Sequence, residues 1–126
     1  MASFGIQKTL DIGFDDALAK IPEALKAEGF GVLTEIDVTA TLQKKIDVDF
    51  RRYRILGACN PPFANQALQA EPDVGVLMPC NVVVREEAGG SVSLVFTDVR
   101  ALFRLIGRPE VAPLAGELHA RLERVS

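Results

Sequence analysis

The chain has few of the residue types that most often carry chemistry. Its 126 residues include one histidine and two cysteines, and the cysteines do not form a CxxC pair. Because a zinc site needs four protein groups, or three and a water, the two cysteines alone do not close one. The chain also has no glycine-rich phosphate loop and no Ser-His-Asp order. These absences exclude the commonest enzyme classes that a sequence can reveal.

Long apolar runs and an excess of basic residues are also missing. No window approaches the ~20 apolar residues that a membrane-spanning helix needs. Charged side chains interrupt the stretch where a signal peptide would need an apolar core: Lys8, Asp11, Asp15 and Asp16. Fourteen basic and seventeen acidic residues give a net charge of -3, which argues against nucleic acid or an anionic membrane as the partner. We therefore expect a cytoplasmic protein that binds neither.

The composition is that of an ordinary globular domain. Hydrophobic residues make up 48% of the chain and charged residues 25%, which indicates neither disorder nor a disulfide scaffold. A chain of this length buries roughly two-thirds of the surface that it exposes when unfolded. We therefore expect residues 1–126 to form a single domain with one core.

Hydrophobic periodicity predicts an α+β fold with about five strands. Alternating or β-branched segments predict strands at residues 3–10, 30–36, 53–58, 81–86 and 92–96. Spacings of three and four predict helices that begin at residues 14, 38, 61, 98 and 111. Pro22 lies inside the first of these patterns, so we expect a kink there or a later start. The sum is a mostly antiparallel sheet covered by helices on one side, with the last two strands as a hairpin.

Both cysteines lie in short mirror-image clusters, Cys59-Asn60-Pro61 and Pro79-Cys80-Asn81, which start 20 positions apart and place the thiols 21 apart. Asn60 is a typical helix cap and Pro61 a typical first helical residue. Cys59 would then lie at the positive end of a helix, where the dipole favours a thiolate. Pro79 cannot donate a hydrogen bond to a strand, so the sheet is interrupted beside Cys80 and leaves room for a ligand.

These clusters predict a binding site for a small ligand or a soft metal, with no identified catalytic residue or cofactor. The metal ligands would be Cys59 and Cys80, in a Cu(I) site or one shared across a dimer. The wider candidate set is Cys59, Asn60, Pro61, Pro79, Cys80, Asn81 and Asp37. Two alternatives stay open: a redox protein in which Cys59 is the reactive thiolate and Cys80 resolves it, and a structural domain with inert thiols. A disulfide is a further possibility.

For the other polar residues, a structural or solvent-exposed position is the simpler interpretation. His119 follows an apolar position of the last helix, so we expect it at the rim of the packed face and not as a third ligand. Asp37, with Glu35 and Lys45, could act in acid-base chemistry if all three shared a cavity, although caps and solvated charges explain them. Arg52 and Arg54 share one strand face, which could bind an anion or form a solvated edge.

Two longer segments resemble a known family. Residues 53–62, YRILGACNPP, and 75–84, GVLMPCNVVV, are similar to the domain-of-unknown-function family 302, and residues 29–38 also fit its opening. The likeness covers nearly the whole chain, and both cysteine signatures are intact. It implies a small protein of β-α-β(4)-α fold, typical of bacteria and archaea, that tends to form homodimers. No activity is established for the family, and Pro22 is the clearest departure from its pattern.

Overall fold

Five strands form one antiparallel sheet in the order β1-β5-β4-β3-β2. The structure, a computed structural model, describes residues 5–107 and 112–125. The strands are β1 (Gly5–Leu10), β2 (Gly31–Asp37), β3 (Tyr53–Cys59), β4 (Cys80–Glu86) and β5 (Val92–Thr97). The α+β class, the antiparallel sheet and its five strands are as the sequence predicts. Residues 3 and 4 of the first predicted strand lie outside the described part.

Helices connect the strands and follow the last one. They are α1 (Phe14–Ala27), α2 (Val38–Ile46), α3 (Pro61–Ala70), the 3-10 helix η1 (Pro72–Leu77), α4 (Val99–Ile106) and α5 (Ala112–Arg124). Asp37 and Asp98 cap α2 and α4 by accepting backbone N–H hydrogen bonds. The predicted start of the last helix at Val111 lies outside the described residues. No helix within the described ranges has the length and apolarity to cross a bilayer.

Pro22 does not delay the first helix. The helix α1 starts at Phe14 and continues past the proline to Ala27, so the expectation of a later start is wrong. Phe14, Ala17 and Ile21 lie on its buried face, and this apolar stripe packs against the sheet. The tertiary packing therefore outweighs the hydrogen bond that a proline inside a helix loses.

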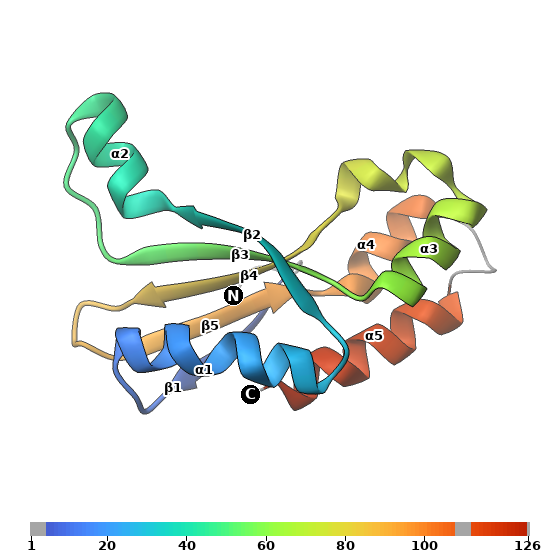
Figure 1. Cartoon of the computed structure of the whole chain (residues 1–126), viewed down its shortest axis with the longest axis horizontal. Coiled ribbons are helices and arrows are strands. Elements are labelled where there is room, and N and C mark those ends of the chain that lie inside the picture. Colours follow the sequence, from blue (N-terminus) through green and yellow to red (C-terminus); the bar gives the residue numbers. More distant parts are fainter. Residues whose placement is uncertain (1–4, 108–111, 126) are drawn as a thin grey trace.

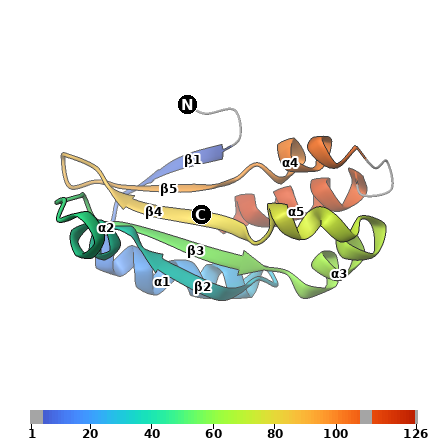
Figure 2. The same ribbon diagram turned by 90° about the horizontal axis from the view of Figure 1, so that it is seen from above.

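One face of the sheet carries the core. Leu56, Val84 and Leu94, from three neighbouring strands, are fully buried there, and residues of α1 and α5 complete the same cluster. Figure 1 shows both helices along this side. In Figure 2, no described helix lies over the opposite face of the strands. The helices therefore cover one side, as the periodicity predicts.

The two ends of the sheet differ. The views from the side and from above both place α2 at one end and α3, α4 and α5 at the other (Figures 1 and 2). No residue of α2 is buried: Val38 and Leu42 are half-buried, and Ile46 is exposed. At the other end the helices enclose the point where β3 ends and β4 begins.

Gly57 lies where β2, β3 and the residue before β4 approach closely. A Cβ atom there would lie 2.8 Å from Cγ of Pro79 and would also collide with Oγ1 of Thr34. We therefore expect Gly57→Ala to lower the free energy of unfolding by about 1–3 kcal/mol, the usual cost of overpacking. Chemical denaturation measures this change.

Gly116→Ala is the matched control, since nothing lies within 4 Å of the added Cβ and the site is in α5. It should leave stability unchanged or raise it by up to ~1 kcal/mol. Equal stability of wild type and Gly57→Ala would contradict the close approach.

Candidate functional site

Strand register brings the two cysteine clusters together. In the β3–β4 ladder, Cys80 lies directly opposite Ala58, and Cys59 is the next residue along β3. Cys59 and Cys80, 21 positions apart in the sequence, thus lie at the same end of the two inner strands β3 and β4. Both thiols are free.

Asn60 fixes the start of α3 beside Cys59. Its side-chain Oδ1 accepts a hydrogen bond from the backbone N–H of Phe63 at 3.3 Å, and Pro61 is the first helical residue. Only 7% of Asn60 is exposed. A Cβ at Gly29 would lie 3.0 Å from its Nδ2 atom, so the backbone at Gly29 passes close to the amide. Asn60 is therefore a structural cap, as its position in the sequence predicts.

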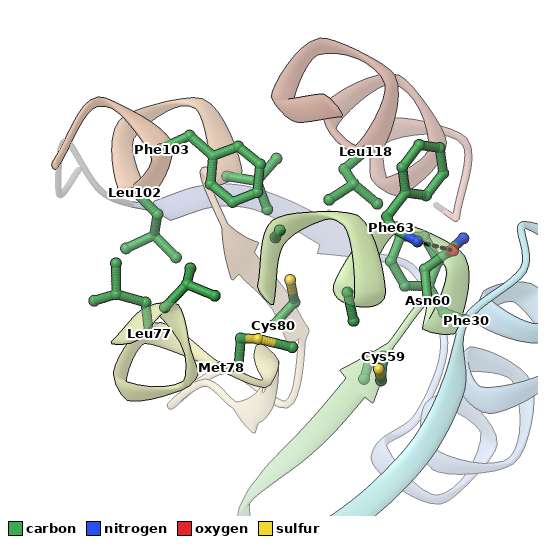
Figure 3. A pocket seen from close by; sticks show the side chains of 15 residues that line it. Phe30, Cys59, Asn60, Phe63, Leu77, Met78, Cys80, Leu102, Phe103 and Leu118 are labelled. Atoms are coloured by element: carbon green, nitrogen blue, oxygen red, sulfur yellow. Dashed lines mark hydrogen bonds between the residues drawn. The ribbon is translucent and has the colours of Figure 1, made fainter. Parts of the chain in front are cut away.

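A small, partly open hollow lies between the cysteines and the surrounding helices. Its volume is about 40 Å³, and Figure 3 shows its wall. The wall comes from β3, β4 and all the helices at this end of the sheet. Its residues are Phe30, Ala58, Cys59, Asn60, Phe63, Ala64, Ala67, Val74, Leu77, Met78, Cys80, Val99, Leu102, Phe103 and Leu118.

The wall is apolar and carries no formally charged side chain among these residues. Burial raises the pKa of the Cys59 thiol. Burial, and to a smaller extent the charge of Cys59, raises the pKa of Cys80 to about 11. Burial thus opposes the readily formed Cys59 thiolate that the sequence predicts.

The hollow includes only part of the expected set. Cys59, Asn60 and Cys80 line it, whereas Pro61 is exposed at the start of α3. Pro79 and Asn81 line an open groove next to the opposite face of the sheet. The two clusters are mirror images in sequence but do not face one cavity with all their members.

Asp37 lies at the far end of β2. It is opposite Arg54 in the ladder, five residues from Cys59 along β3, which is roughly 16 Å in an extended strand. Its Oδ1 accepts a hydrogen bond from the N–H of Ala40, and its Oδ2 pairs with Arg54 at 3.2 Å. Glu35 pairs with the same arginine. Asp37 thus has a structural role in this arrangement.

His119 is more buried than the sequence suggests. Only 9% of it is exposed, its Nε2 pairs with Glu123, and it does not line the hollow. Arg52, the other arginine of the predicted anion face, pairs with Asp15 and lies over the ring of Phe14. The packing of these residues does not depend on a ligand.

Met78 is the functional candidate that sequence reasoning missed. Its thioether lines the hollow together with both thiols, and in Figure 3 its side chain extends from the end of η1 toward Cys80. The chain has two methionines in all, and this one stands two residues before Cys80. Attention to every sulfur near the clusters, and not only to the thiols, could have found it.

Two comparisons place the chain among known proteins. The family model "Domain of unknown function DUF302" matches residues 6–126. The crystal structure of an uncharacterized conserved DUF302 protein from Bacillus stearothermophilus is similar, with 31% sequence identity and a TM-score of 0.90. The match covers 98% of this chain and 96% of the other. Among curated proteins, none matches.

The raised pKa values predict slow thiol chemistry at neutral pH. With a pKa of about 11, roughly one Cys80 in a thousand is a thiolate at pH 8, against roughly a quarter of unperturbed cysteines. Reaction with a small alkylating reagent, followed by peptide mass spectrometry, should therefore accelerate only as the pH rises toward that value.

The same protein in denaturant supplies the control, since both cysteines should then react rapidly. If Cys59 reacted faster in the native protein than in denaturant at pH 7, the inferred environment of its thiol would be wrong and the redox alternative would gain support.

Proposed function

The chain belongs to the DUF302 family, which has no assigned activity, and we propose from its own site that it binds one soft metal ion between Cys59 and Cys80. One observation carries the proposal: both cysteines line the same small, largely apolar hollow. Thiolate sulfur is the ligand type that soft ions prefer. Binding would exchange two S–H bonds for two bonds from sulfur to metal and release two protons, with no change in oxidation state.

The size of the hollow favours an ion over an organic ligand. A cavity of roughly 150 Å³ is needed to admit benzene, and a single water needs about 10–15 Å³. The hollow offers about 40 Å³, which suits one ion or a very few atoms. An organic ligand would require the helices around the hollow to move apart. Of the two predicted ligands, a small molecule and a soft metal ion, the metal ion is therefore better supported.

The side chains that could bind a metal at this site favour an ion with a low coordination number. Among the residues that the structure describes, no three His, Cys, Asp or Glu side chains gather to hold a metal. A closed zinc site usually takes four such groups. Two thiolates therefore fit an ion that accepts few, soft ligands better than they fit zinc.

The alternative of a thiol redox enzyme has less support. A reactive cysteine needs a depressed pKa, whereas burial raises the pKa of both thiols. Free thiols also agree with a reducing compartment, so we place the function in the cytoplasm. The alternative of inert structural thiols remains as an outcome of the metal titration.

We also propose that two copies associate through β2 and α2. Among the described residues, β2 pairs with β3 alone, so its outer edge is available to another strand. Of the nine large hydrophobic residues that are exposed in the described part of the chain, six lie between residues 32 and 50: Val32, Leu33, Ile36, Ile46, Val48 and Phe50. Such a patch on an open strand edge is typical of a protein interface, and a twofold axis would let β2 pair with its own copy.

The metal proposal predicts one Cu(I) per chain. The reduced protein, kept free of air, should withdraw Cu(I) from the chromogenic chelator bicinchoninate until one equivalent per chain is bound. The double variant Cys59→Ser, Cys80→Ser should withdraw none, because serine hydroxyls are poor ligands for a soft ion. Loss of the chelator's absorbance measures the transfer.

Gln66→Ala, an exposed change on α3, should behave as wild type. Failure of the wild type to compete at any chelator concentration, or equal binding by the double serine variant, would exclude the proposed site. The second outcome would leave the thiols as structural groups.

The dimer proposal predicts a mass of twice 13.6 kDa by size exclusion with light scattering. Leu33 is 67% exposed on β2, and Leu33→Glu should shift the protein to the monomer because it places a charge in the proposed interface. Leu105→Glu, at a residue of α4 that is 74% exposed, is the control and should remain dimeric. A monomeric wild type would refute the dimer.

A further inference from the structure

A third sulfur lines the hollow that holds the two thiols. Met78 belongs to the same wall as Cys59 and Cys80. The three side chains come from the end of β3, the start of β4 and the short segment between η1 and β4. In Figure 3 all three sulfurs are seen around the space beneath α3. Thiolate and thioether sulfur together form a ligand set that favours Cu(I).

The backbone around Met78 is held on both sides. Its N–H donates a hydrogen bond to the carbonyl of Gly75 at 3.2 Å, which ends η1. Pro79 follows, and β4 begins directly after it with Cys80. The position of the Met78 Cα is thus set by the register of β4, while its unbranched side chain can still adjust to a guest.

Met78 also stands at the boundary between the hollow and solvent. Met78, Leu77 and Leu102 line both the hollow and a more open groove of about 440 Å³ beside Pro79 and Asn81. These three side chains therefore form the partition between the two spaces. An ion that enters from the groove would meet the thioether before it reaches the thiols.

We infer that Met78 is the third ligand of the metal site and that the resulting three-sulfur set selects Cu(I) over Zn(II). This inference rests on the proposed function. Zinc is held by thiolate, imidazole and carboxylate groups in a tetrahedral set, so a thioether adds little to its binding. Cu(I) gains a soft neutral donor that brings no further negative charge into an apolar space.

The surroundings suit the charge of such a complex. Cu(I) with two thiolates and one thioether carries one negative charge. Cys59 adjoins the N-terminal end of α3, which begins at Pro61 after the Asn60 cap, and the positive end of a helix dipole stabilises a nearby anion. The free cysteine thiols lose their protons to the solvent on binding, so no internal base is required.

Met78→Leu tests the inference, because leucine has nearly the same volume and such swaps usually cost little stability. Competition against bicinchoninate should show that the variant still binds one Cu(I) per chain, with an affinity at least about tenfold weaker. Loss of a residue that only supports a metal ligand already weakens metal binding by roughly 10–100-fold, so loss of a ligand should cost no less. Its affinity for Zn(II), measured against a zinc chelator, should equal that of wild type. X-ray absorption at the copper edge should find three sulfur neighbours in wild type and two in the variant.

Leu102→Ile is the control, since it alters an apolar residue of the same partition and leaves all three sulfurs in place. Its Cu(I) affinity should match that of wild type. If wild type binds Cu(I) and Met78→Leu binds it equally well, with the same number of sulfur neighbours, Met78 is not a ligand and the proposed function stands without it. If wild type binds no Cu(I), the proposed function itself fails.

Discussion

The pairing of β3 with β4 is the constraint on which the site depends. Because Cys80 lies opposite Ala58, the two cysteine clusters lie at the same end of the neighbouring strands β3 and β4. A shift of one residue would send the Cys80 side chain to the opposite face. Asn60 then turns the chain into α3 at the same place. One backbone register thus decides both where the thiols lie and which helix closes the space above them.

The apolar wall of the hollow has two opposing consequences. It raises the pKa of both thiols, which disfavours a free thiolate and with it nucleophilic chemistry. Apart from Asn60, the side chains of this wall offer sulfur as their only ligand atoms, so a soft ion that can displace the thiol protons would meet few competing ligands. The environment that makes a redox role less favourable is therefore compatible with metal binding, provided that the ion contributes the positive charge that offsets the thiolates.

Much of the fold follows from local signals, and the site follows only in part. Alternation identifies the strands, and Asp37 and Asn60 act as the caps that their positions indicate. The role of Met78 depends on how η1, α4 and α5 pack, which no local pattern contains. The helix-dipole argument for Cys59 leaves out burial, which the sequence does not reveal and which raises the pKa of this thiol. Periodicity likewise predicts α2 as amphipathic but cannot tell that none of its residues is buried within the described chain.

The proposed site holds a single soft ion between sulfurs in one hollow of each chain. Native mass spectrometry of the untagged protein, isolated without oxidant and supplied with Cu(I), tests it most directly. The account predicts a mass increase of one copper per chain, accompanied by the loss of two protons, that disappears after both thiols are alkylated under denaturing conditions and the protein is refolded. If the protein kept the mass of the bare polypeptide after exposure to Cu(I), or if copper stayed bound after alkylation, the proposed site would be contradicted.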